Sequence, residues 1–229
     1  MELNRSTFYY ISQLPVRAQR LFKHCLFPFY KRNPNDFPPT SILEWIFDLW
    51  FYIIDMVGLP EIYQILMRFF KWNLRSLTDG ESALAKSIFG DNIRLELIKI
   101  DDAARFGTRK VAAAYVSFNT INYFQKIRKE VFIHELVHIW QFQHFGSIYI
   151  ARAIKAQRSK AGYDYGGLPN LYHQMMKGAK LTDFNFEQQA DIIEDFYRIT
   201  TQSVRSAPMH LSIYQYFAAQ LAINNVSSS

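Results

Sequence analysis

The segment EVFIHELVHIWQFQHFG, residues 130–146, contains residue types and spacings that could hold a metal ion. On a helix, His134 and His138 project from the same face, so their two imidazoles can bind one ion. Glu135 lies one position round the helix, where its carboxylate can reach water at the metal without being a ligand. The flanking residues are apolar, and buried polar groups need partners. The pattern HELVH therefore predicts a zinc ion (Zn²⁺) at this helix.

Two positions compete for the third ligand. His144 lies six residues after His138, where the elongated pattern H-E-x-x-H-x-x-G-x-x-H has its last histidine. In that pattern a glycine lets the chain leave the helix, whereas this chain has Gln141, which lacks glycine's freedom at positive φ. If the helix continues, His144 faces a different side from His134. His144 is therefore the less favoured candidate.

The segment NFEQQADIIEDF supplies the favoured candidate. Glu187 and Asp191 lie four residues apart on one face of an expected helix, in the pattern E-x-x-x-D. A glutamate on a second helix can complete the coordination, and an aspartate one turn later can accept a hydrogen bond from the free ring nitrogen of a ligand histidine. Carboxylate-rich helix faces are common, so the pattern E-x-x-x-D alone would not indicate a metal ligand. It does so here because HELVH lies upstream.

The elements that position these residues follow from hydrophobic periodicity and from helix start and stop signals. Thr78 and Glu81 form a capping-box pattern, and Gly90 is a helix stop. The segment AGYDYGGLPN, residues 161–170, is expected to be a loop. Strands are expected in IRLELIKI and in VAAAYVSFNTINYF. Helices are expected at 41–57, 60–75, 130–145, 147–158, 184–200 and 208–223. This order predicts a mainly helical α+β fold with a small sheet.

Residues 1–76 are expected to form an aromatic-rich helical region that precedes a domain at 77–229. The segment KRNPNDFPPT, residues 31–40, contains three prolines and is typical of a linker. The two helices that follow are expected to form a hairpin whose rings pack together or on the next domain.

Carboxylates interrupt the most hydrophobic stretch of the chain, SILEWIFDLWFYIIDMVGLP. Glu44, Asp48 and Asp55 recur at helical spacing and predict one polar stripe on an otherwise apolar helix. The same three charges argue against a helix that spans a membrane.

Composition indicates a folded protein, since 49% of the 229 residues are hydrophobic and 17% are aromatic. The net charge is +6, and residues 1–40 hold six Lys or Arg against two Asp or Glu. This excess favours contact with an acidic partner or an anionic membrane through residues 8–58, or forms a solvated surface. The basic residues do not cluster densely, which argues against nucleic acid as a partner.

A single cysteine, Cys25, excludes an intramolecular disulfide and favours a reducing compartment. No signal peptide is readable at the N-terminus. A cytoplasmic location is therefore expected, with a membrane-peripheral location or export by a non-classical route as alternatives.

HELVH followed by FEQQAD resembles the gluzincin clan of zinc metallopeptidases. The longer segments LTDGESALAKSIFGDNI, NTINYF, FIHELVHIWQ and FNFEQQADII together resemble small bacterial zinc peptidases linked to contractile or type VI secretion systems. The resemblance covers about residues 76–200, and residues 1–75 match no known pattern. It implies a zincin-like metallopeptidase domain.

The resemblance also implies roles for individual residues. The zinc ligands would be His134, His138 and Glu187, with Glu135 as general base and Asp191 as the outer partner of a ligand histidine. Such sites need a group that stabilises the oxyanion. The spacing of residues in the sequence does not distinguish between three candidates for this role. These candidates are Tyr165, His173 and His210. The strand near FNTINYF is expected to pair with an extended peptide substrate.

Three functions are consistent with the sequence. The leading hypothesis is a zinc-dependent hydrolase that cleaves a peptide bond in protein or in cell-wall peptide. The second is a scaffold or assembly factor that contacts a secretion-apparatus protein and whose zinc site is structural or vestigial. The third is a peripheral membrane protein held through residues 8–58.

Overall fold

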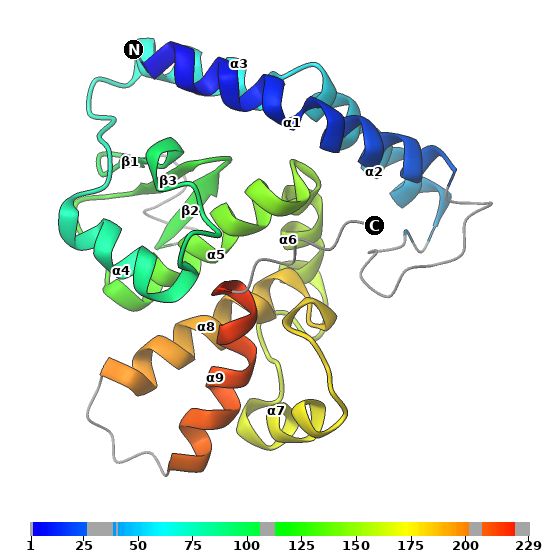
Figure 1. Cartoon of the computed structure of the whole chain (residues 1–229), viewed down its shortest axis with the longest axis vertical. Helices are drawn as coiled ribbons and strands as arrows, with labels where there is room; N and C mark the ends of the chain where they lie inside the picture. The colour runs from blue at the N-terminus through cyan, green and yellow to red at the C-terminus, as the bar shows by residue number, and fades with distance from the viewer. Residues whose placement is uncertain (1, 27–38, 40, 106–112, 202–207, 223–229) are drawn as a thin grey trace.

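The computed structural model of the chain describes residues 2–26, 39, 41–105, 113–201 and 208–222. Helices dominate, and three short strands form one small sheet (Figure 1). The expected mainly helical α+β architecture is confirmed. Apart from residue 39, the predicted linker at 31–40 lies outside the described residues.

Three N-terminal helices form a layer along one edge of the molecule (Figure 1). They are α1 (Glu2–Cys25), α2 (Ile42–Met56) and α3 (Leu59–Phe70). Gly58 has a φ of 73° and lets the chain pass from α2 into α3 within two residues. Helix α3 ends five residues before the predicted position 75, because the backbone of Arg75 pairs with that of Ile100 and the chain has become extended.

The predicted polar stripe on α2 is confirmed and faces inward. Three buried carboxylates of α2 and α3 each contact a donor on α1 or on the chain from position 147 onward. The pairs are Asp48 with Arg152, Asp55 with Ser147, and Glu61 with Arg17. These contacts occupy the inner face. The prediction that the rings pack together or on the next domain is therefore wrong for four exposed residues, which are Phe47, Trp50, Phe69 and Phe70.

The sheet has the order β1-β3-β2. Strand β1 (Lys99–Asp101) runs parallel to β3 (Thr120–Tyr123), which pairs antiparallel with β2 (Ala114–Ser117). The sequence predicted one or two strands in the segment VAAAYVSFNTINYF, and the structure has two. The predicted strand in IRLELIKI is confirmed only at the end of the segment, because Leu95–Leu97 form a 3-10 turn and pairing with β3 begins at Lys99.

The remaining helices include the long buried helix α5, which packs against α8 and α6. Thr78 and Glu81 cap α4 reciprocally, as predicted. The bounds of these helices are α4 Asp79–Phe89, α5 Lys129–Phe145, α6 Ile148–Arg158, α7 Gly167–Met176, α8 Phe186–Thr201 and α9 Pro208–Ala222. Helix α7 was not predicted. The loop expected at 161–170 ends at Gly166, and α7 begins at the next residue. Gly166 is left-handed, with a φ of 80°, and Pro169 suits the first turn of the new helix.

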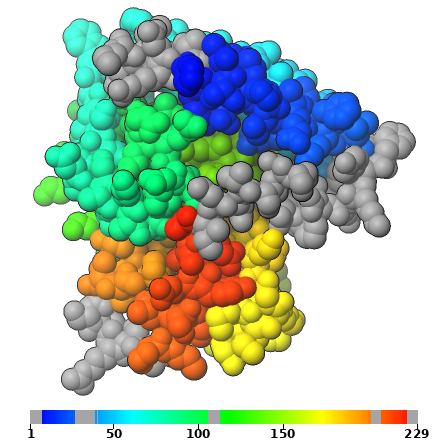
Figure 2. All heavy atoms as spheres, in the orientation of Figure 1, coloured from blue at the N-terminus to red at the C-terminus, as the bar shows by residue number. Residues whose placement is uncertain are grey.

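The N-terminal layer rests directly on the rest of the molecule, and its helix α1 (blue) is seen in the space-filling view (Figure 2). Contacts between α2 and α6 join the layer to the half that contains α5 and α8. No helix within the described ranges combines the length and the apolar character needed to cross a bilayer.

Candidate metal centre

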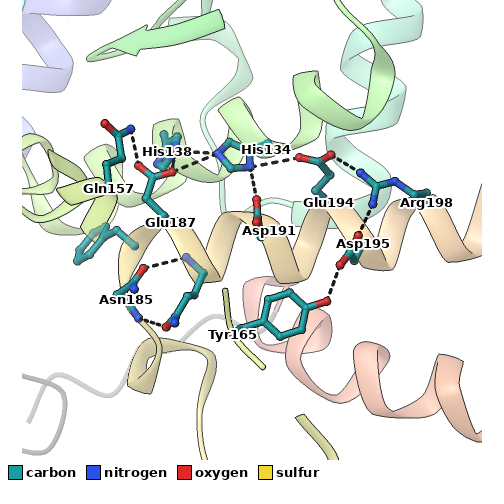
Figure 3. A network of polar contacts seen from close by, with 12 residues as sticks. His134, His138, Gln157, Tyr165, Asn185, Glu187, Asp191, Glu194, Asp195 and Arg198 are labelled. Carbon is teal, nitrogen blue, oxygen red and sulfur yellow. Dashed lines mark hydrogen bonds and ion pairs between the residues drawn. The ribbon is translucent and has the colours of Figure 1, made fainter. Parts of the chain in front are cut away.

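Three ligand-type atoms from α5 and α8 converge on one point (Figure 3). Nε2 of His138 lies 3.3 Å from Nε2 of His134. Oε2 of Glu187 lies 3.4 Å from the His134 atom and 3.5 Å from the His138 atom. All three side chains are buried. The fold thus brings together the three residues that the sequence predicted as ligands.

The distances between these atoms fit a tetrahedral ion. Nitrogen and oxygen ligands bind zinc at about 2.0–2.2 Å, which puts neighbouring ligand atoms of a tetrahedron about 3.3–3.6 Å apart. Oε2 of Glu187 is buried and has no hydrogen-bond partner among the described residues. A buried, unsatisfied carboxylate oxygen is costly, and a cation between the three atoms would satisfy it. These residues therefore fit zinc.

Helix packing explains why the three side chains meet. Helix α5 is buried along its length from Phe132 to Phe142, so its histidines face another element rather than solvent. That element is α8, whose buried face includes Glu187 in its first turn. The two helices share one apolar core, to which they contribute Ile133, Leu136, Val137, Ile192 and Ile193.

A buried glutamine fixes the tautomer of His138. Nε2 of Gln141 donates hydrogen bonds of 2.9 Å to the carbonyl of Phe186 and 3.0 Å to Oε1 of Gln189. The other amide atom, Oε1 of Gln141, must therefore be the acceptor at its 2.8 Å contact with Nδ1 of His138. His138 then has its proton on Nδ1 and a free lone pair on Nε2. Gln141, which the sequence analysis used only to judge His144, is a residue of the site.

The second ring nitrogen of His134 lies between two carboxylates. Nδ1 is 3.1 Å from Oδ1 of Asp191 and 3.3 Å from Oε2 of Glu194. Arg198 contacts Glu194 at 2.5 Å on the side away from the histidine (Figure 3). Burial lowers the pKa of His134, but the surrounding carboxylates outweigh burial and raise that pKa well above its ordinary value.

Asp191 lies where the sequence predicted it, and Glu194 is an addition. The position seven residues after Glu187 shares a helix face with it, so periodicity alone could have identified Glu194.

The ligand oxygen of Glu187 is selected by a residue from a third helix. Nε2 of Gln157, on α6, donates a hydrogen bond of 2.9 Å to Oε1 of Glu187. The other oxygen is thereby left to face the two histidines. Burial works to raise the pKa of Glu187, but contacts with His134 and His138 outweigh it and lower that pKa to about 2. The carboxylate is therefore ionised in this arrangement.

Glu135 faces the same cavity as the three ligand-type residues. The cavity has a volume of about 470 Å³, and its wall includes β2 through Tyr115 and Val116. Strand β2 is an edge strand of the sheet, whereas β3, which lies in the segment FNTINYF, is the central strand. The prediction that the strand near FNTINYF pairs with a substrate is therefore wrong, because both edges of β3 are already paired. Burial raises the pKa of Glu135, against the opposing effect of the two histidines. A larger cavity of about 640 Å³ lies beside α7 and contains none of these side chains.

His144 lies away from the candidate ligands. It is exposed at the end of α5, where Nδ1 lies 2.9 Å from the carbonyl of Trp140. Its ring stacks on that of Trp140 with the centroids 4.5 Å apart. The helix continues through position 141, as expected from Gln141, and so directs His144 to another face.

The three predicted oxyanion candidates do not line the 470 Å³ cavity. The hydroxyl of Tyr165 lies 2.7 Å from that of Tyr214 and also contacts Asp195. His173 is exposed on α7, and His210 lies in the first turn of α9.

Tyr163, which the sequence analysis did not single out, does line the cavity. Its ring centroid is 6.1 Å from that of His134, and its side chain is 44% exposed. It lies in the segment expected to be a loop, where hydrophobic periodicity gives no signal.

Comparisons with known proteins identify one similarity of sequence and one of structure. No family model matches the chain. The chain is 28% identical over 141 residues to the type VI secretion system spike protein VgrG2b of Pseudomonas aeruginosa. That match takes in 54% of this chain and only 13% of the spike protein. The solved effector domain of VgrG2b matches with a TM-score of 0.41 and 23% identity, over 65% of this chain and 84% of that chain.

The matched relative belongs to the secretion system that the sequence resemblance named. Zinc binding, the zincin-like fold and peptide cleavage stay predictions.

Proposed function

We propose that this chain is a zinc-dependent hydrolase of the gluzincin type, which cleaves a peptide bond in protein or in cell-wall peptide. The observation that carries the proposal is the triangle of His134, His138 and Glu187, with sides of 3.3, 3.4 and 3.5 Å, beside Glu135 in a cavity. A structural zinc site is closed by four protein ligands, whereas a catalytic site has three and leaves one position open. Three ligands that border a cavity support the catalytic type.

The residues around the triangle have separable roles. Zinc, when bound, would supply Lewis-acid polarisation of the substrate carbonyl and activation of water. Glu135 takes the proton of the attacking water and passes it to the leaving amine. Its raised pKa suits a group that must first accept and then return a proton. Gln141 and Gln157 orient ligand side chains through their hydrogen bonds to His138 and Glu187.

Strand β2 supports an extended peptide as the substrate. It forms the edge of the sheet, and Ala114, Tyr115 and Val116 border the cavity that contains Glu135. An edge strand has unpaired backbone groups with which a peptide can form hydrogen bonds. Tyr163 borders the same cavity, and we assign its hydroxyl the role of donor to the developing oxyanion.

The similarity to the spike protein VgrG2b supports a place for this chain in type VI secretion, in association with the secretion apparatus. The chain spans 13% of that protein, so a spike function of its own is not part of the proposal.

The decisive experiment compares the wild-type protein with Glu135→Gln. We expect both to bind one zinc, while the variant loses cleavage of unfolded casein or of purified peptidoglycan. Glu130→Gln, the same change five residues earlier on α5, is the matched control and should keep activity. A Glu135→Gln variant that binds zinc and retains its biological effect would overturn the enzyme proposal in favour of a scaffold with a structural zinc site.

A further inference from the structure

Helices α2 and α3 expose an apolar face. Every exposed residue between positions 42 and 72 is hydrophobic. The exposed fractions include 62% for Phe47, 71% for Phe69 and 96% for Trp72. We call this surface the outer face, and it consists of Ile42, Leu43, Ile46, Phe47, Trp50, Ile53, Val57, Leu59, Ile62, Leu66, Phe69, Phe70 and Trp72. Contiguous apolar surfaces of this kind on a folded protein indicate an interaction site.

Buried polar contacts hold the outer face outward. Asp48 contacts Arg152 on α6, and Ser147 donates to Asp55 through its backbone at 2.9 Å and its hydroxyl at 2.5 Å. Rotation of α2 to bury its apolar side would break both of these polar contacts. Breaking a buried ion pair is strongly unfavourable. The exposure of the apolar side is therefore a fixed property of the fold.

We propose that the outer face docks on a lipid bilayer surface. Protein interfaces surround an apolar centre with a polar rim that forms about one hydrogen bond per 100–200 Å². The outer face offers no exposed polar or charged side chain between positions 42 and 72 for such a rim. A bilayer needs none, and it accommodates Trp and Phe at the level of its headgroups. This inference does not depend on the proposed zinc chemistry.

The charge distribution is complementary to an anionic bilayer. The carboxylates of α2 and α3 turn inward, and the half-buried Glu44 pairs with Lys155, so the outer face presents no negative charge. Helix α1 packs along α2 and α3 and carries the exposed Lys23. Arg17 of the same helix is buried and pairs with Glu61, so it does not add to this surface charge. Basic residues near an apolar face strengthen its attraction to anionic lipid.

The test is flotation of the full chain with vesicles of phosphatidylcholine and phosphatidylglycerol. We expect the wild type to float with the vesicles and its tryptophan emission to shift to the blue, because Trp50 and Trp72 leave water. A triple variant, Phe47→Ser, Trp50→Ser and Phe69→Ser, should lose vesicle partition by about tenfold or more. These side chains are exposed, so the far-ultraviolet circular dichroism should not change.

The matched control changes exposed apolar residues on α7 and α9: Tyr172→Ser, Met176→Ser and Met209→Ser. This variant should float like the wild type. Flotation that survives in the outer-face variant would overturn the proposal. If the wild type does not float, the bilayer is not the occupant, and light scattering then decides what is. A wild-type dimer that the outer-face variant lacks would assign the face to a second copy of the chain.

Discussion

Oε1 of Gln141 lies 2.8 Å from Nδ1 of His138 and determines which nitrogen of that ring faces the candidate metal position. The two other contacts of the glutamine amide leave it no alternative orientation. A residue that the motif HELVH does not include thus orients one of the motif's candidate ligands.

Replacement of this glutamine should weaken zinc binding. In Gln141→Leu the ring of His138 loses its acceptor, so we expect zinc affinity to fall by about 10–100-fold, as for other outer partners of metal ligands. Competition against a chromophoric chelator measures the change. Gln143→Leu, two residues along the same helix, is the control and should bind zinc like the wild type. Equal affinity in the two variants would show that the contact does not position His138.

Loss of the third ligand should have a larger effect. We expect Glu187→Gln to lose zinc affinity by more than the factor of about 100 that bounds the effect of outer partners. Zinc content after gel filtration, measured by mass spectrometry, is the readout. His144→Ala should retain one zinc, because the ring of His144 stacks on Trp140 away from the candidate ligands and its carbonyl accepts from Arg20. Zinc lost from the His144 variant and kept by the Glu187 variant would reverse the assignment.

Substitution of Tyr163 should affect catalysis, whereas substitution of Tyr165 should affect stability. Tyr163 borders the cavity, so Tyr163→Phe should lower kcat by roughly 10²-fold while zinc content stays the same. Tyr165 has its hydroxyl committed to Asp195 and Tyr214, so Tyr165→Phe should lower the free energy of unfolding by about 1 kcal/mol and leave kcat near the wild-type value. Steady-state kinetics and urea unfolding on both variants check this contrast. The opposite pattern would return the oxyanion role to Tyr165.

Removal of one partner of the buried ion pair between Asp48 and Arg152 should lower the free energy of unfolding strongly. Arg152→Met leaves Asp48 buried without its partner, and we expect a loss of about 3–5 kcal/mol in the free energy of unfolding. The double variant Asp48→Leu with Arg152→Met should recover most of that loss. Lys86→Met, which removes an exposed pair at 3.9 Å with Asp91, should change stability by at most about 1 kcal/mol. Urea unfolding measures all three, and no recovery in the double variant would contradict the account.

Acidification should weaken the contact between α1 and α2. His24 is buried, its Nε2 lies 2.9 Å from the carbonyl of Trp45, and its ring stacks on Trp45. Burial lowers the pKa of His24 below its ordinary value of 6.5. Between the two pKa values the unfolded chain binds a proton that the folded chain does not, so stability falls as pH falls below 6.5.

The measurement is the urea midpoint between pH 7 and pH 5. We expect the wild type to lose more stability across this range than His24→Gln, which keeps an N–H donor and does not titrate. Parallel pH profiles for the two proteins would contradict the prediction.

The sequence predicted most of the candidate site because a helix converts spacing into geometry. His134, His138, Glu187 and Asp191 lie on two regular helices, so positions four residues apart gave their relative directions. The contacts of Gln141 and Gln157 join residues 48 and 30 positions apart. No local pattern reports such contacts, and the sequence analysis missed both glutamines. Tyr163 was missed for a related reason, since it lies in an irregular segment.

The fold was predictable where capping residues mark the ends of a helix, as in α4. It was not predictable where tertiary contacts override the local pattern. The segment IRLELIKI has alternating apolar residues, but its pairing is limited by the length of β3. The orientation of α2 is the strongest case, because contacts to Arg152 and Ser147 turn its carboxylates inward and its rings outward.

Helix α6 belongs to the candidate site and to the N-terminal layer at once. Its Arg152 and Lys155 hold α2, while Ala153, Ile154 and Gln157 form a wall of the cavity, all within eleven residues. A short helix moves as a rod, so a displacement of α2 would move Gln157 and, through it, the carboxylate of Glu187. Helix α6 is therefore a direct structural connection between the helix that carries the apolar face and a candidate metal ligand.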